Sequence, residues 1–164
     1  MSDPVVADAG PLISLAKIGR LQLLRELYDR AVVPEAVFGE LEVSRLRPGY
    51  RQLVSALDEG WLSPVSLGPP LVSQPSVPAL DPGEYEAILL ASRIPCRLLL
   101  IDDRAGRKVA ARLGLPVVGT GGVLLAAKNR GLLRNVGLVL DELAMSDFRL
   151  SPDLRRKLLE LAAE

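Results

Sequence analysis

Short apolar segments recur along the chain, and segments with helical spacing separate each of them from the next. A strand that is exposed on one face alternates apolar and polar residues, whereas these segments are apolar throughout, as in strands buried on both faces. Such strands separated by helices predict an α/β fold with a central short parallel β-sheet flanked by α-helices on both faces. The strands are expected at 4–8 (PVVAD), 31–34 (AVVP), 96–102 (CRLLLID) and 116–119 (PVVG).

Turn residues and helical periodicity place the remaining elements within a single domain, 1–164. Residues 61–66 are expected to be extended, and the five prolines of 67–83 predict a proline-rich loop. Ser151, followed by Pro152, is a helix start and begins the C-terminal helix segment, 151–164. Helices are predicted near 10–19, 20–29, 34–47, 50–60, 83–94, 103–114, 120–131, 134–146 and 152–163.

The composition excludes several classes of enzyme. With no histidine, the chain has no imidazole for acid–base catalysis, for activating a Ser or Cys nucleophile, or for binding catalytic zinc. The only cysteine, Cys96, cannot form an internal disulfide and fits a reducing compartment. No apolar run is long enough for a membrane span and no secretory signal is visible, so we expect a cytoplasmic protein.

Carboxylates occur where a ligand site is expected. Asp8 ends the first strand, and Asp102 and Asp103 end the third; in parallel α/β sheets, ligands bind beyond these carboxyl ends. Glu40 and Glu84 lie at or near the apolar stripes of two helices. Acids that converge repel one another unless a cation neutralises them, and oxygen ligands suit Mg²⁺ or Mn²⁺. The alternatives are structural: Asp8 capping a helix, Glu84 stabilising a helix dipole, Glu40 solvated, and one of Asp102 and Asp103 capping a helix.

In the order and spacing of these acids and of the segments around them, the chain resembles PIN-domain proteins. Among PIN-domain proteins, it is most similar to a subgroup of VapC-like toxin ribonucleases. The resemblance rests on the order of VVADAGPLISLAKIG, VPEAVFGEL, LDPGEYEAILLA, LLLIDDRAGRKVAARLGLPVVGTGGVLLAAKNRG and FRLSPDLRRKLLE. It implies a PIN-like fold, a Mg²⁺- or Mn²⁺-dependent ribonuclease, a homodimer and a small antitoxin partner. The acids that match the family pattern are Asp8, Glu40, Glu84 and Asp103, with Asp102 as an equally placed candidate for the last metal ligand.

Basic residues that follow the last acids could hold the RNA backbone without reading its sequence. Arg104, Arg107 and Lys108 belong to this group, and Thr120 could contribute a hydroxyl beside the site or cap the helix that it begins. An apolar stripe on the last helix predicts either self-association or packing on its own domain. The residues of this stripe are Leu154, Leu158, Leu159, Leu161 and Ala162.

Other functions remain possible. The resemblance departs from many PIN nucleases at Ala9, where they have a hydroxyl residue, and in lacking an aromatic residue just after the fourth acid. A catalytically silent PIN scaffold that acts as a protein-binding module is therefore the main alternative. The segment VVGTGGVLL is typical of a nucleotide-binding turn, but Leu124 replaces the third glycine. LLLIDD occurs in phosphoacceptor domains, but no later strand ends supply the acid and lysine that they need.

Overall fold

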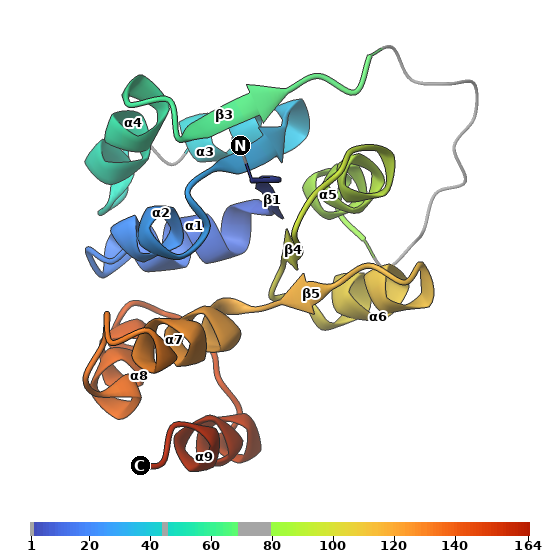
Figure 1. Cartoon of the computed structure of the whole chain (residues 1–164). Coiled ribbons are helices and arrows are strands. Elements are labelled where there is room, and N and C mark those ends of the chain that lie inside the picture. The colour runs from blue at the N-terminus through green and yellow to red at the C-terminus, as the bar shows by residue number, and fades with distance from the viewer. Residues whose placement is uncertain (1, 44–45, 69–79) are drawn as a thin grey trace.

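The computed structural model describes residues 2–43, 46–68 and 80–164, in which short strands alternate with helices (Figure 1). The strands are β1 (Val5–Ala7), β2 (Ala31–Pro34), β3 (Leu62–Val65), β4 (Leu99–Leu100) and β5 (Val117–Val118). The helices are α1 (Ala9–Lys17), α2 (Gln22–Tyr28), α3 (Glu35–Val43), α4 (Tyr50–Asp58), α5 (Pro82–Arg93), α6 (Arg104–Arg112), α7 (Thr120–Asn129), α8 (Val136–Met145) and α9 (Pro152–Leu161).

The strands form one parallel sheet in the order β3-β2-β1-β4-β5, so the first strand lies at its centre. Val6 pairs with Leu99 and Ala7 with Leu100, which sets β1 and β4 to end at the same edge. β3 contains Pro64, which has no N–H to donate, and its position at the edge of the sheet accommodates this residue. The predicted α/β fold with a parallel central sheet is confirmed.

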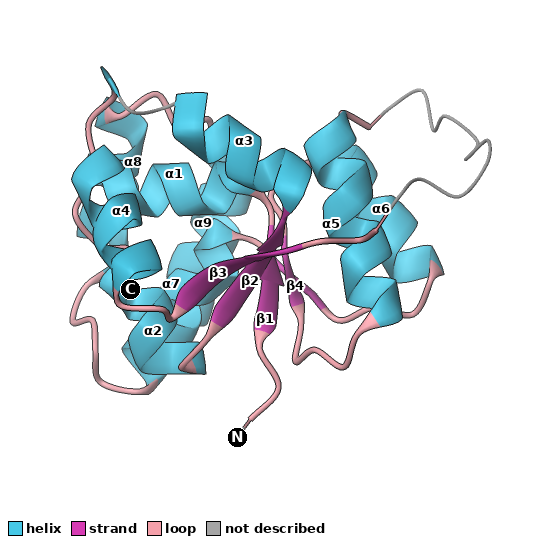
Figure 2. Ribbon diagram, turned by 90° about the horizontal axis from the view of Figure 1, so that it is seen from above, coloured by secondary structure: helices cyan, strands magenta, loops and turns pink. Residues whose placement is uncertain are grey.

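Alternate side chains of the strands enter two separate cores, as strand geometry requires. Val5 and Ala7 face the core that also contains the buried residues of α1, α2, α7 and α8. Val6, Leu99 and Ile101 face a smaller core formed with α5 and α6. Figure 2 shows these two groups of helices on opposite sides of the sheet. Burial on both faces explains why β1, β2 and β4 are apolar at every position, whereas the edge strand β3 is only partly buried and contains Ser63 and Pro64.

Several predicted boundaries differ from those in the structure. Pro34 is the last residue of β2, not the first of a helix, and α3 ends at Val43, within the predicted 34–47. The predicted loop 67–83 extends too far, because Pro82 and Gly83 form the first turn of α5. Its other prolines lie outside the described residues. The strand predicted at 96–102 is reduced to Leu99–Leu100, since only these residues pair with both neighbours.

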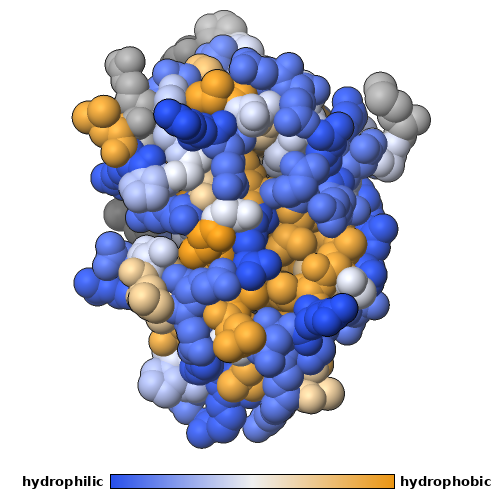
Figure 3. Space-filling model, turned by 90° about the vertical axis from the view of Figure 1, so that its left-hand side faces the viewer, coloured by the Kyte–Doolittle hydropathy of each residue, from blue (hydrophilic) through white to orange (hydrophobic). Residues whose placement is uncertain are grey.

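The C-terminal helix packs mainly on its own domain. Leu158 and Ala162 are buried in the larger core and Leu159 packs against it, whereas Leu154 and Leu161 are exposed. The face drawn in Figure 3 is mostly polar, with apolar residues gathered in part of it. No helix in the described ranges is both long and apolar enough to cross a membrane.

Two side chains satisfy the first amide groups of α8. Asn135 accepts a hydrogen bond from the N–H of Leu138 at 2.8 Å, as an N-cap residue does. Glu164 accepts from the N–H groups of Val136 and Gly137 at 2.7 and 2.9 Å, and Lys128 donates to it at 2.8 Å. These interactions, the Lys128 hydrogen bond first, lower the pKa of Glu164 to about 2.

We predict that Glu164→Gln lowers the melting temperature at pH 7, because the amide cannot pair with Lys128 or complement the helix dipole as a carboxylate does. The folded-state pKa is below the ordinary value of 4.5, so this stabilisation is present above pH 4.5 and is lost as the pH falls toward 2. Thermal denaturation at pH 7 and pH 3 measures the difference between variant and parent, which should shrink at pH 3. Glu160→Gln, an exposed change in α9, is the control. A difference that is the same at both pH values would contradict this role of Glu164.

Candidate metal centre

Asp8 follows the last residue of β1 and is the most buried acid of the predicted site, with 7% of its surface exposed. Its backbone N–H donates to the carbonyl of Leu100 at 2.9 Å, so the residue continues the pairing of β1 with β4. It occupies the N-cap position of α1 but makes no side-chain capping hydrogen bond. Burial is the main cause that raises its pKa to about 7, and the charges of Asp81, Glu40 and Glu84 raise it further, whereas the N–H of Ala9 lowers it.

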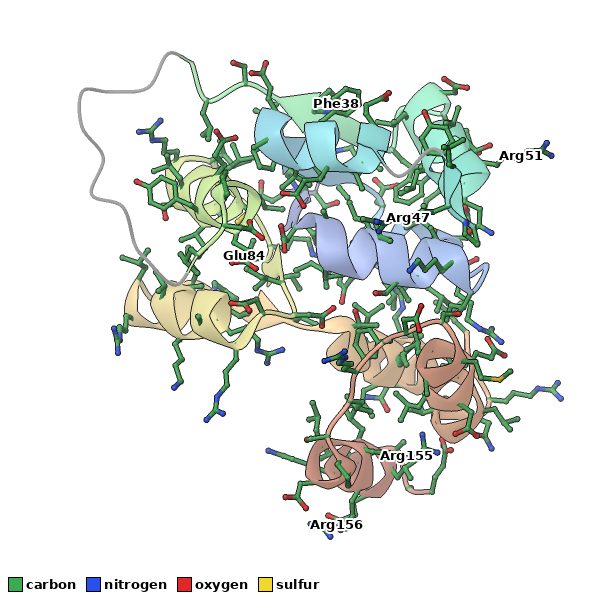
Figure 4. All side chains as sticks on the ribbon, turned by 180° about the vertical axis from the view of Figure 1, so that it is seen from behind. Phe38, Arg47, Arg51, Glu84, Arg155 and Arg156 are labelled. Carbon is green, nitrogen blue, oxygen red and sulfur yellow. The ribbon has the colours of Figure 1, made fainter. Side chains whose placement is uncertain are left out.

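Glu84 lies in the first turn of α5 and forms a capping box with Asp81. Asp81 accepts from the N–H of Glu84 at 2.8 Å, and Glu84 accepts from the N–H of Asp81 at 3.1 Å. The structural role suggested for Glu84 is therefore present. Burial raises the pKa of Glu84, as do the nearby charges of Asp81 and Asp103. In Figure 4, which views the carboxyl ends of the strands, Glu84 lies between α5 and α6.

Glu40, from α3, reaches the first turn of α5 beside Gly83. A Cβ atom added to Gly83 would overlap Oε1 of Glu40 and lie 3.1 Å from its Cδ, so the glycine leaves the space that this carboxylate occupies. Burial and then the charge of Asp81 raise the pKa of Glu40. Glu40 is exposed to solvent, yet it also interacts with the other acids of the group and is therefore not merely a solvated charge.

The two adjacent acids after β4 have different partners. Asp103 is the N-cap of α6 and accepts from the N–H of Gly106 at 2.8 Å, which confirms that one of the pair caps a helix. Asp102 accepts from both the backbone N–H and the hydroxyl of Thr120, at 2.7 and 2.6 Å. Burial raises the pKa of Asp102, while the Thr120 hydrogen bonds and the charge of Arg107 lower it.

The suggested capping and substrate-binding roles of Thr120 do not match its surroundings. Gly119 is the N-cap residue of α7, and Thr120 is the first residue of the helix. The side chain is fully buried, and its hydroxyl donates to Asp102. Thr120 therefore orients a carboxylate and has no surface that could contact a substrate in this structure.

The structure brings four predicted acids into one electrostatic neighbourhood, and it directs the fifth elsewhere. Glu40, Glu84 and Asp81 act on Asp8, and Asp103 acts on Glu84. Among the described residues, no three acidic or thiol side chains are close enough to hold an ion in their present rotamers. The donor set nevertheless fits a hard divalent cation, because it is made of carboxylates that repel one another around a buried member. Asp8 has no side-chain cap to satisfy it and is the natural centre of that site.

The predicted basic residues lie on α6, the helix that Asp103 caps. Arg104, Arg107 and Lys108 are all exposed there. Because Asp103 is in direct contact with the start of this helix, the basic side chains extend from the border of the acidic group. This position suits contacts with a phosphate backbone near the carboxylates.

Sequence reasoning missed Asp81, which lies among the acids and affects the pKa of three of them. The segment Asp81-Pro82-Gly83-Glu84 has the spacing of a capping box with proline at the first helical position. That signal would have begun the helix at Pro82 and placed Asp81 beside Glu84.

We predict that Asp8→Asn stabilises the metal-free protein more at pH 7 than at pH 4.5. The folded-state pKa of about 7 exceeds the ordinary value of 3.8, so the folded protein binds more protons than the unfolded chain between these values. The stability of the parent therefore falls as the pH rises from about 4 to about 7. Asparagine does not titrate, and the relative gain should be on the order of a few kcal/mol.

Urea denaturation in EDTA at the two pH values measures this gain. Asp58→Asn, at the exposed end of α4, is the matched control and should show no comparable pH-dependent gain. An Asp8→Asn variant whose stability relative to the parent is equal at pH 4.5 and pH 7 would show that Asp8 is not a buried carboxylate under repulsion.

Comparison with known proteins agrees with this geometry. A family model, DUF3368, described as a PIN domain, matches residues 4–164. No curated protein and no solved structure matches the chain. The match spans the five strands found among the described residues and includes every acid of the candidate centre. This chain belongs to the DUF3368 family of PIN domains.

Proposed function

We propose that this protein is a Mg²⁺- or Mn²⁺-dependent endoribonuclease. PIN domains are in general nucleases that use divalent metal ions. The observation that carries the proposal is the buried Asp8 carboxylate, whose pKa is raised by desolvation and by three neighbouring acids. Such a group is costly to ionise by itself and gains most from a bound cation. The basic helix α6 beside the acids supports a nucleic-acid substrate, and RNA is proposed because the chain resembles VapC-like ribonucleases.

The acids have distinct roles in this proposal. Asp8, Glu84 and Asp103 are the proposed metal ligands, and Glu40 either contributes a further ligand or orients the attacking water. Asp102 is the weaker candidate, because Thr120 already donates two hydrogen bonds to its carboxylate. Asp81 holds Glu84 at the start of α5 through the capping box. A bound divalent ion supplies a more acidic water and charge stabilisation for phosphodiester hydrolysis.

Residues other than the acids would bind the substrate, and water activation would depend on the metal. The chain has no histidine, so no imidazole is present to activate water. Arg104, Arg107 and Lys108 would hold phosphate groups through charge, which favours a nucleic acid without selecting its sequence. Asp103 would leave its α6 cap, at least in part, to serve a cation, since one of its oxygens accepts from Gly106.

The biological setting follows from the resemblance to VapC-like toxins. We propose that the protein acts in the cytoplasm as the toxin of a toxin–antitoxin pair, is silenced by a small antitoxin protein and forms a homodimer. Exposed apolar residues of α8 and α9, such as Leu138 and Leu161, leave surface for such contacts. The second candidate function, a silent PIN scaffold that binds protein, is favoured by Ala9 in the place of a hydroxyl residue.

We predict that the purified protein cleaves single-stranded RNA with Mg²⁺ or Mn²⁺ and that excess EDTA abolishes cleavage. Asp8→Asn should reduce the cleavage rate at least about a hundredfold, as expected when a ligand of a catalytic metal is weakened, and Asp58→Asn should leave it unchanged. Gel analysis of an end-labelled RNA measures the rate. Cleavage that persists in EDTA would exclude the metal mechanism, and absence of cleavage with every divalent ion would favour the silent scaffold.

We also predict that Mn²⁺ raises the melting temperature of the parent. A cation that binds only the folded state at a hundredfold excess over its Kd stabilises it by about 2.7 kcal/mol. For a domain of this size the melting temperature should rise by about 5 °C. Asp8→Asn should lose most of this rise, whereas Glu160→Gln, on the exposed surface of α9, should keep it. A Mn²⁺ response of Asp8→Asn equal to that of the parent would remove Asp8 from the metal centre.

A further inference from the structure

A cavity of about 300 Å³ lies next to the candidate metal centre and has no role in it. It is lined by β5, the start of α7, the segment 148–150 and the first part of α9, and Asp102 and Arg107 also line it. Its volume is at the lower end of the range for small-ligand sites, about 300–1,000 Å³. In Figure 1, β5 leads directly into α7, and α9 lies below α7.

Glycines shape the wall of this cavity. A Cβ atom added to Gly121 would lie 2.7 Å from a methyl group of Leu158, so α9 packs directly against the backbone of α7. The N–H groups of Gly121 and Gly122 belong to the first turn of α7, where helices have no internal acceptor. In the part of the chain that the structure describes, neither N–H has a hydrogen-bond partner. The cavity therefore offers backbone donors as well as space.

The charged groups of the cavity favour an anion. The guanidinium groups of Arg107 and Arg149 form no ion pair or hydrogen bond with any described residue. Among the described residues that line the cavity, Asp102 is the only acid, and both of its oxygens accept hydrogen bonds from Thr120. The charge of Arg107 acts on this carboxylate, and Arg149 lines the same cavity. A phosphate group fits this environment, because guanidinium groups bind its oxygens in pairs.

The rest of the lining is apolar and includes one aromatic ring. Phe148 and Leu150 come from the segment before α9, and Leu154 and Leu158 come from α9 itself. Leu154 is 46% exposed, so this side of the cavity is not covered by the chain. Aromatic rings in such sites accept the flat face of a nucleobase, and cationic side chains nearby hold the backbone.

We propose that this cavity is a nucleotide subsite, which holds the base and phosphate of an RNA nucleotide adjacent to the one being cleaved. The proposal rests on the nuclease function and names a contact that the acids do not provide. Phe148 and the leucines receive the base, while Arg107, Arg149 and the first-turn N–H groups of α7 receive the phosphate. Asp102 joins the two sites: it lines the cavity and precedes Asp103 in the chain.

Binding of nucleoside 5′-monophosphates in EDTA tests the subsite without cleavage. In amide NMR spectra, adenosine or uridine 5′-monophosphate should shift the resonances of Gly119, Gly121 and Gly122. Ribose 5-phosphate, which lacks the base, should bind at least about fivefold more weakly, since stacking of one base contributes about 1–3 kcal/mol. Shifts confined to other parts of the protein, or equal affinity for ribose 5-phosphate, would overturn the proposal.

Substitutions in the lining separate the subsite from the rest of the surface. Arg149→Gln and Phe148→Leu should each weaken mononucleotide binding at least about fivefold, and the leucine preserves the apolar packing of Phe148 against the core. Arg156→Gln is the matched control, because Arg156 lies on α9 (Figure 4), is not part of the cavity lining and has a side chain that is 69% exposed. Unchanged melting temperatures confirm that the variants fold. Affinities equal to that of the parent in both cavity variants would overturn the subsite.

The experiments distinguish failure of the subsite proposal from failure of the nuclease proposal. Mononucleotide binding at the glycine amides, together with no RNA cleavage in Mg²⁺ or Mn²⁺, would support the subsite and reject the nuclease. Metal-dependent cleavage without any change at these amides would reject the subsite and leave the nuclease intact.

Discussion

Parallel pairing of β1 with β4 is the constraint on which the site depends. The pairing of Ala7 with Leu100 makes both strands end at one edge of the sheet, and the N–H of Asp8 extends the ladder to the carbonyl of Leu100. A helix follows each of these strands, α1 after β1 and α6 after β4. The acids that follow these strands, Asp8 and Asp103, therefore lie at the same edge of the sheet, and Glu84 links them electrostatically, because its charge acts on Asp8 and the charge of Asp103 acts on it.

The fold handles this concentration of negative charge with helix N-termini and a hydroxyl. Asp81 and Glu84 cap α5, Asp103 caps α6, and Asp102 accepts two hydrogen bonds from Thr120. Each of these interactions provides a carboxylate with a hydrogen-bond donor. Asp8 makes no such side-chain cap, and burial together with the neighbouring acids raises its pKa to about 7. The free-energy cost of ionising a carboxylate therefore remains uncompensated at Asp8, which follows the central strand of the sheet.

The acids of the candidate site that follow strand ends could be predicted from the sequence. The side-chain contacts between segments that are distant in the chain could not. Asp8 and Asp103 follow apolar strands, so their common edge follows from the parallel topology. Glu40 and Asp81 lie near each other because α3 and α5 pack together, a contact between segments that are distant in the chain. No local pattern specifies that packing. Thr120 could not be assigned correctly either, because its partner is eighteen positions earlier in the chain.

The sequence by itself determined the fold class, since apolar strands that alternate with helices are typical of a parallel sheet covered by helices on both faces. It also determined which acids end strands and that no histidine takes part in the chemistry. Tertiary structure decided which of two adjacent carboxylates turns toward Thr120 and which caps α6. It also decided that Phe148 and Arg149 share a cavity with the glycines of α7. These choices depend on how α6, α7 and α9 pack around β5, and contacts between distant segments have no signature in local composition.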